Sequence, residues 1–309
     1  MKKFLFYILV FAVAVTAFFS ILGYFGQTNW KLDLFSHFKW QYFLILTIGT
    51  VILFFIKRKL SLIFIPFIIA ILIEIAPLYF GGNKDKSLNE TTKIVCINLL
   101  SSNGQFEDVE EYIKQKDPDL IVLQEFNNLW QMMLEPKLKA YKYRLTIPRD
   151  DNFGIAVYSK MNISELEELK IGDAGVPSIQ GDILLGTSRV RLITTHPLPP
   201  VDTWYFDHRN TQLSELGTLV SALDHEVIVI GDLNTSSFST HFKELISKSG
   251  LIDTRKGFGQ LTTWPTWFNL AKTTLDHCLV SKGISVKSRE VGEDIGSDHL
   301  PIFVELAVE

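Results

Sequence analysis

The chain has 309 residues, with 30 Lys and Arg, 34 Asp and Glu, and a formal net charge of −4. Residues 83–309 carry 23 of the basic and 32 of the acidic side chains, a formal charge of −9. Domains that bind nucleic acid through its phosphates usually have a basic surface, so tight, non-specific binding of nucleic acid is disfavoured. The two cysteines, Cys96 and Cys278, are too few for a disulfide framework. We expect two buried thiols, and the alternative is a single disulfide if their strands lie side by side outside the cytoplasm.

Three apolar stretches occupy the N-terminal part of the chain. Residues 4–25 contain no charged side chain and are long enough for a membrane-spanning helix, and residues 40–56 and 60–80 follow. Glu74 and two prolines interrupt the third stretch, so an interfacial hairpin is the alternative to a third span. We therefore predict a membrane region over residues 1–82 with about three transmembrane helices.

Basic residues predict the orientation of this region in the membrane. Lys2, Lys3 and the cluster at 57–59 belong on the cytoplasmic side. With three spans, the polar linker 83–92 and the domain 93–309 then lie outside the cytoplasm. If the third stretch does not span, the domain lies in the cytoplasm instead.

Short β-branched runs and amphipathic stretches follow the linker. The first half alternates strands with helices, and strands dominate the second half, which favours a layered α/β domain. Predicted strands lie at 93–100, 120–125, 153–159, 190–196, 227–234 and 274–281, with a turn and a last strand at 296–304. Predicted helices lie at 106–115, 130–141, 207–223 and 241–249.

Polar side chains stand at the ends of six of these strands. Each is also typical of an ordinary turn or helix cap, but their repetition favours a shared crevice. The set consists of Asn98, Glu125, His196, Asp232 with Asn234, Asp276, and Asp298 with His299.

The chemistry of these side chains is that of a phosphoester hydrolase with a hard cation. Glu125 and Asp298 offer anionic oxygen ligands to Mg²⁺ or Mn²⁺. Asp276 can hold one ring nitrogen of His299, which then acts at phosphorus, and His196 can donate to a phosphate oxygen.

The motifs resemble those of the endonuclease/exonuclease/phosphatase superfamily, the DNase-like hydrolases. Over residues 93–304 the chain has, in the family's order, Gln-Glu at 124–125, Gly-Asp-Leu-Asn at 231–234, Leu-Asp-His at 275–277 and Ser-Asp-His at 297–299. The resemblance implies a four-layered α/β sandwich of two packed β-sheets flanked by helices. The preceding apolar stretches make the chain similar to membrane-anchored bacterial members, which implies the inner membrane, with several spans and the catalytic domain outside the cytoplasm.

The resemblance also implies roles for individual residues. Glu125 would bind Mg²⁺ or Mn²⁺, with Asn98 and Asp298 close to it. Asp232 and Asn234 would orient the attacking water and the phosphate. The pair of His299 and Asp276 would be the general base or transition-state partner, and His196 a phosphate contact. Leu100 departs from the acid that the abasic-site nucleases carry at this position, which argues against that activity.

Three further residues are candidates for contact with the substrate. Arg209 and Gln212 lie one helical turn apart, although a helix-to-sheet contact would place them equally well. Trp264 lies in an aromatic segment that could form a wall of the site or part of the core. The expected partners are a phosphoester, as nucleic acid, lipid head group or small molecule, and a lipid bilayer.

We therefore expect a membrane-anchored, metal-dependent phosphodiesterase or nuclease in which water attacks phosphorus in line. The alternative is a phosphatase of phospholipids or of small phosphomonoesters. A catalytically silent binding protein of the same fold, or a channel formed by the spans, agrees less well with the complete set of polar strand ends. The sequence indicates no protein partner.

Overall fold

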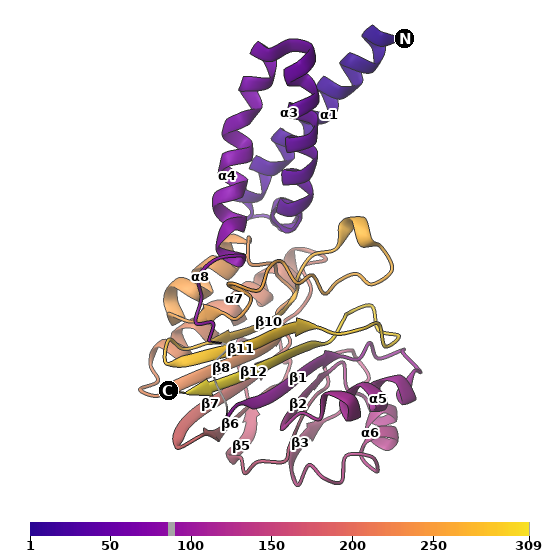
Figure 1. The fold of residues 1–309 in the computed structure, drawn as a ribbon. Helices are drawn as coiled ribbons and strands as arrows, with labels where there is room; N and C mark the ends of the chain where they lie inside the picture. The colour runs from indigo at the N-terminus through magenta and orange to yellow at the C-terminus, as the bar shows by residue number, and fades with distance from the viewer. Residues whose placement is uncertain (86–89, 309) are drawn as a thin grey trace.

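The computed structural model describes residues 1–85 and 90–308 and consists of two stacked β-sheets below a bundle of helices (Figure 1). The expected linker at 83–92 is therefore only partly described, because 86–89 lie outside these ranges, as does Glu309. One sheet has the strand order β11-β12-β1-β2-β4-β3, and the other has the order β5-β6-β7-β8-β10-β9.

Twelve strands form the two sheets among the described residues. The first sheet contains β1 (Thr92–Asn98), β2 (Leu120–Gln124), β3 (Tyr143–Ile147), β4 (Ile155–Ser159), β11 (Ile284–Val291) and β12 (Ile302–Val308). The second sheet contains β5 (Ser164–Leu169), β6 (Ser178–Leu185), β7 (Ser188–Thr195), β8 (Glu226–Asp232), β9 (Ile252–Asp253) and β10 (Asp276–Val280).

Helices cover the outer face of each sheet. Those on the first sheet are α5 (Phe106–Lys116) and α6 (Asn128–Leu134), and those on the second are α7 (Thr203–Ser221) and α8 (Thr240–Ser249). Aliphatic side chains of both sheets fill the layer between them, where both cysteines are buried and free. The α/β sandwich of two packed sheets flanked by helices is confirmed.

Strand direction brings the polar strand ends to one edge. The parallel pairs β1–β2 and β7–β8 end at the same edge of their sheets. The antiparallel strand β10 starts where β8 ends, so that Asp276 pairs with Asp232. Antiparallel β12 likewise starts beside the end of β1, with Ile302 opposite Cys96. The site is therefore a consequence of topology.

Several elements differ from the sequence prediction. The prediction missed β3, β5, β6, the two-residue β9 and β11. Strands β3 and β5 lie at sheet edges, and their exposed polar residues weaken the apolar signal. Helix α7 begins at Thr203, because the Asp202 side chain accepts a hydrogen bond from Tyr205 N and caps it. Helix α6 ends at Leu134, shortly before Pro136, which cannot continue a helix.

The N-terminal bundle contains α1 (Lys2–Leu22), α2 (Trp30–Leu34), α3 (Lys39–Ser61) and α4 (Ile65–Ile75). Two helical stretches, Lys2–Phe25 and Trp30–Leu78, are long and apolar enough to cross a membrane, and only 22% of the most apolar window of each is buried. Non-helical backbone at Lys57 lets the second stretch fold back on itself. The N-terminus and this turn lie at the end of the bundle remote from the sheets (Figure 1).

Two ion pairs, one of them fully buried, fasten the bundle to the sandwich. Asp33, next to the end of α2, accepts a hydrogen bond from Arg209 Nη2 at 2.8 Å and from Ser239 Oγ at 2.7 Å. Asp33 and Arg209 are 0% exposed. Glu74 of α4 pairs with Lys39 at 3.4 Å and with Lys243 of α8 at 3.3 Å. The acid that interrupts the third apolar stretch therefore has two cationic partners where the bundle meets the sandwich.

Replacing Asp33 with Ala should destabilise the full chain strongly, because it leaves the buried Arg209 charge without its counter-ion. We expect a loss of about 3–5 kcal/mol in the free energy of unfolding, measured by denaturation in detergent. The double variant Asp33→Leu/Arg209→Met should regain most of that loss. Asp173→Ala, which removes an exposed acid, is the matched control and should change stability little.

Candidate active site

The polar strand ends surround one cavity of about 460 Å³ at the edge of the sandwich. Its apolar wall includes Phe153, Leu275 and the stretch Pro199–Val201. The predicted site residues that line it are Glu125, His196, Asp232, Asn234, Trp264, Asp298 and His299. Side chains of both sheets therefore face the same space.

Asp232 is the centre of the polar network. Its Oδ2 lies 3.1 Å from Asn98 Nδ2, 3.4 Å from His196 Nε2 and 3.6 Å from His299 Nε2. Its Oδ1 accepts a hydrogen bond from Asn234 N at 2.8 Å, which closes a tight turn at the end of β8. One buried carboxylate thus contacts three other predicted site residues through a single oxygen.

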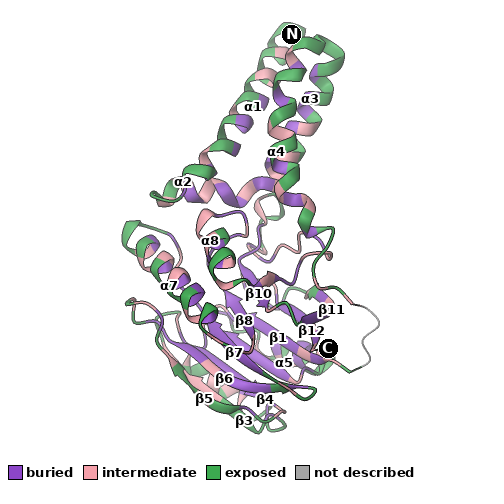
Figure 2. Ribbon diagram, turned by 90° about the vertical axis from the view of Figure 1, so that its left-hand side faces the viewer, coloured by how far each residue is buried: buried purple, intermediate pink, exposed green. Residues whose placement is uncertain are grey.

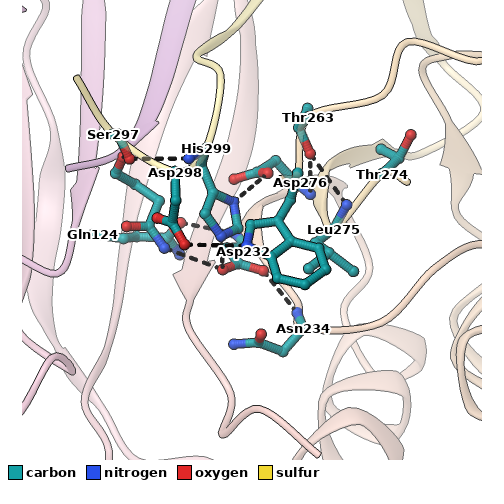
Figure 3. Close-up of polar contacts among 12 residues, drawn as sticks. Gln124, Asp232, Asn234, Thr263, Thr274, Leu275, Asp276, Ser297, Asp298 and His299 are labelled. Atoms are coloured by element: carbon teal, nitrogen blue, oxygen red, sulfur yellow. Dashed lines mark hydrogen bonds and ion pairs between the residues drawn. The ribbon is translucent and has the colours of Figure 1, made fainter. Parts of the chain in front are cut away.

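His299 lies between two carboxylates. Its Nδ1 is 2.8 Å from Asp276 Oδ2, and its Nε2 faces Asp232 (Figure 3). The His299 backbone N–H donates to Ser297 Oγ, and this hydroxyl donates to the carbonyl of Asn98. The Ser-Asp-His segment is therefore fixed to the end of β1, and the imidazole has one orientation.

Electrostatics in this network favour charged forms. Burial opposes a charge on His299, but the carboxylates of Asp276 and Asp232 outweigh it and raise its pKa to about 10. Burial would likewise raise the pKa of Asp232, but His299 and His196 outweigh it and lower the value to about 2. Burial opposes the charge of His196 too, but its contact with Asp232 raises its pKa. At neutral pH the site therefore holds an anionic Asp232 facing a cationic His299.

Two carboxylates beside this network could hold a divalent cation. Glu125 and Asp298 line the cavity, and Asp298 Oδ1 is buried without a hydrogen-bond partner among the described residues. Glu125 Oε1 lies 3.2 Å from Asn98 Nδ2. Two carboxylates, with one buried oxygen unsatisfied, fit Mg²⁺ or Mn²⁺. Asn98, predicted as a further ligand, turns its Nδ2 to Glu125 and Asp232, and its Oδ1 accepts from Leu100 N.

A second cluster, Asp232, Asp276 and His299, also brings potential metal ligands within 4.8 Å of one another. Its members already satisfy each other, because Asp276 binds the imidazole on one side and Asp232 faces it on the other. This cluster is therefore explained as a row of ion-paired side chains. The carboxylates of Glu125 and Asp298 remain the better site for a cation.

Backbone conformation at the strand ends is unusual. Glu125 has a φ of 54° and Asn234 a φ of 49°, in the left-handed region. Asn adopts this region readily, whereas Glu does so rarely, so the surrounding structure must hold Glu125 in place. The Ser101 backbone N–H does part of this by donating to Glu125 Oε2 at 3.0 Å.

Gln124 braces the site from behind. Its Nε2 donates to Thr195 O at 2.8 Å, and its Oε1 accepts from Asp232 N at 2.7 Å, so one buried side chain joins β2 to β7 and β8. Gly231 leaves room for it, because a Cβ there would lie 2.5 Å from Gln124 Nε2. Beyond the Gln-Glu motif, no local signal predicts this bracing role of Gln124, since its partners are backbone groups distant in sequence.

Two of the proposed substrate contacts lie outside the cavity. Arg209 is fully buried and bonds Asp33 and the carbonyl of Asn234, and buried Gln212 donates to Thr195 Oγ1. The positions of Arg209 and Gln212 therefore agree with the alternative prediction, a structural contact between helix and sheet. Trp264 does line the cavity, and its Nε1 donates to Asp298 Oδ2 at 3.1 Å.

The N-terminal bundle contributes cavity residues that the sequence analysis missed. Trp30, Leu34 and His37 line the same space as the catalytic candidates. The only local hint of a functional role was the presence of two titratable residues, Asp33 and His37, between two apolar stretches. Nothing in the local pattern connects these residues to strands more than 60 residues away.

The fold and the site together define a two-sheet α/β hydrolase of the DNase-like class. The family model of the Endonuclease/Exonuclease/phosphatase family matches residues 95–299, which is well over half of the chain. The chain belongs to this family, and this membership places it among hydrolases that act on phosphoesters. No curated protein sequence matches the chain.

Solved structures share this fold at low sequence identity. The human Nocturnin catalytic domain with bound sulfate is 16% identical with a TM-score of 0.60, over 72% of this chain and 96% of that one. A humanized D. rerio TDP2 is 18% identical with a TM-score of 0.58, over 71% and 100%. A family protein from Leptotrichia buccalis is 19% identical with a TM-score of 0.55, over 71% and 99%.

Gln124→Leu should weaken both the fold and the site, because it leaves Thr195 O and Asp232 N buried without partners. We expect a loss of about 2–6 kcal/mol in the free energy of unfolding, measured with denaturant. Gln131→Leu removes a more accessible amide and is the matched control, with an expected effect within about 1 kcal/mol. Equal stability of both variants would contradict the bracing role.

Asp276→Asn should lower the pKa of His299, because it removes the anion that holds the imidazole proton. In chelator-treated protein, ¹⁵N NMR of the imidazole should show His299 protonated through neutral pH in the wild type and titrating at lower pH in the variant. Asp224→Asn, at an exposed acid far from the site, should leave the titration unchanged. An unchanged His299 titration in Asp276→Asn would refute this electrostatic role.

Proposed function

We propose that the protein is a membrane-anchored, divalent-metal-dependent phosphoester hydrolase in which water attacks phosphorus in line. The observation that carries the proposal is the ion-paired chain from Asp276 through His299 to Asp232, next to the carboxylates of Glu125 and Asp298 in one cavity. Family membership supports the reaction class.

The ion-paired residues Asp232, His299 and Asp276 have distinct tasks in this reaction. Asp232 stays anionic because its pKa is about 2, so it can accept a hydrogen bond from the attacking water and orient it. The cationic imidazole of His299 can donate a hydrogen bond from its Nε2–H to a phosphoryl oxygen and stabilise the charge that develops there. His196 can do the same from β7, and Asp276 keeps His299 in position.

Glu125 and Asp298 are the residues that would hold Mg²⁺ or Mn²⁺, and Asn98 would position Glu125 through its amide N–H. When bound, such an ion neutralises phosphoryl oxygens and lowers the pKa of a bound water. Trp264 would hold Asp298 in place through its indole N–H. A catalytically silent protein of the same fold is disfavoured, because every member of this set is present and faces the cavity or the network behind it.

The membrane anchor is part of the proposal. The bundle leaves long apolar helices exposed, as expected for a surface that contacts lipid (Figure 2). We infer that the basic end, with Lys2, Lys3 and the cluster at 57–59, faces the cytoplasm and that the sandwich lies on the other side. A reporter at the C-terminus that is active only in the cytoplasm would overturn this placement if it gave signal.

Hydrolysis of a soluble phosphodiester tests the proposed reaction. The detergent-solubilised full chain should hydrolyse bis(p-nitrophenyl) phosphate with Mg²⁺ or Mn²⁺ and lose the activity with EDTA. Asp232→Ala and His299→Ala should each lower kcat by about 10²–10³-fold. Glu125→Gln should raise the metal concentration needed for half-maximal rate.

The partly exposed Glu135, which follows α6 on the outer side of the first sheet, provides the matched control. Glu135→Gln should leave both the rate and the metal requirement unchanged. If wild type hydrolyses no phosphoester with either metal, or if Asp232→Ala is as fast as wild type, the proposed function is wrong.

A further inference from the structure

We propose that the segment between the first two apolar stretches completes the active site, and that the substrate is a phosphoester carried by a membrane lipid. The inference rests on the proposed function and names its substrate class. Trp30, Leu34 and His37 supply the part of the cavity wall that the sandwich does not. The cavity is therefore closed by residues that directly precede the long helix α3.

Buried contacts hold this wall in one position. Asp33 bonds Arg209 and Ser239, and Arg209 Nη1 donates to the carbonyl of Asn234 at 3.0 Å. Thr273 Oγ1 also donates to the carbonyl of His37 at 3.0 Å. The wall is thus linked through one guanidinium to the turn that carries Asp232 and Asn234, so bundle and catalytic groups form one site.

The wall has the chemistry of a site for an amphipathic molecule. Trp30 and Leu34 add apolar surface to a cavity that the charged groups of the strand ends also line. His37 is 95% buried (5% exposed), and its Nε2 has no hydrogen-bond partner among the described residues although the side chain lines the cavity. A ligand with a polar, anionic head and an apolar remainder would satisfy both kinds of surface.

Exposed apolar side chains continue from the cavity to the bundle. We call Val201, Trp204, Trp267, Phe268 and Leu270 the rim. Val201 lines the cavity, and Leu270 lines a neighbouring crevice with Leu44 of α3, so these two residues of the rim lie where the sandwich meets the bundle. Trp267 and Leu270 are 75% and 77% exposed. Exposed Trp and Phe at the end of apolar helices are typical of the membrane–water interface.

This arrangement places the cavity at the height of the lipid head groups. Helices α1 and α3 also expose many apolar side chains, and lipid or another apolar partner is the expected cover for such a surface. The sandwich itself is acidic, which disfavours a long polyanion such as nucleic acid. A lipid in the same membrane can reach the cavity without leaving the bilayer surface.

The reaction follows the proposed chemistry. Water forms a new P–O bond while the P–O bond to one alcohol of the lipid breaks, and the leaving alkoxide takes up a proton. The products are an alcohol and a phosphate with one ester fewer. Whether the lipid part leaves as alcohol or stays as phosphate depends on which ester bond lies in line.

The test compares lipid and soluble substrates on the same full chain. The protein is placed in nanodiscs of phosphatidylcholine, phosphatidylethanolamine, phosphatidylglycerol and phosphatidic acid, with Mg²⁺ or Mn²⁺. Mass spectrometry follows diacylglycerol and phosphatidic acid, and parallel samples contain bis(p-nitrophenyl) phosphate or single-stranded DNA. We expect at least one phospholipid to be consumed with a higher kcat/KM than either soluble substrate.

Substitutions in the wall and the rim should affect the lipid reaction most. Trp30→Ala and Trp267→Ala should each lower the ratio of lipid to soluble-diester rates by about tenfold. Leu129→Ala, at an exposed leucine of α6 on the far face of the sandwich, is the control and should leave this ratio unchanged.

The outcomes separate the inference from the proposed function. Hydrolysis of the soluble diester or of DNA without hydrolysis of any lipid overturns the lipid inference and leaves the proposed function standing. An unchanged ratio in both tryptophan variants overturns the role of the wall and the rim. Failure to hydrolyse any substrate overturns the proposed function and the inference together.

Discussion

The side chain of Gln124 is the connection on which the rest of the site depends. It donates to a carbonyl of β7 and accepts from the backbone N–H at the end of β8, so it crosses the apolar layer between the sheets at their catalytic edge. Aliphatic side chains alone can slide past each other, whereas two directional hydrogen bonds fix how the sheets meet. The position of Asp232 relative to Glu125 follows from this.

The fold was largely predictable because apolar strands ending in polar groups are a local pattern. Asp232, Asp276 and His299 each follow or precede a strand that the sequence marks clearly, and family motifs add their order. The edge strand β5 was missed because four of its six residues are exposed, which removes the apolar alternation that indicates a strand. The charge state of His299 was also not predictable, since it depends on two carboxylates brought together only by folding.

The contribution of the N-terminal segment illustrates a different limit of sequence reasoning. Trp30, Leu34 and His37 lie between apolar stretches, and there they look like residues of a connecting loop. Their role follows from one long-range pair, Asp33 with Arg209, which are 176 residues apart in sequence. No pattern within a window of the chain can indicate such a pair, and the family motifs begin after it.

The pair of Asp33 and Arg209 also determines which part of the chain can keep its interior intact as a separate fragment. Motifs and composition divide the chain near residue 83, as if the hydrolase began there. A fragment starting at that point would keep Arg209 in the interior but lose its counter-ion, and Phe238 would lose the bundle residues that cover it. The catalytic machinery and the bundle therefore share an interior, and the smallest intact piece of this protein includes both.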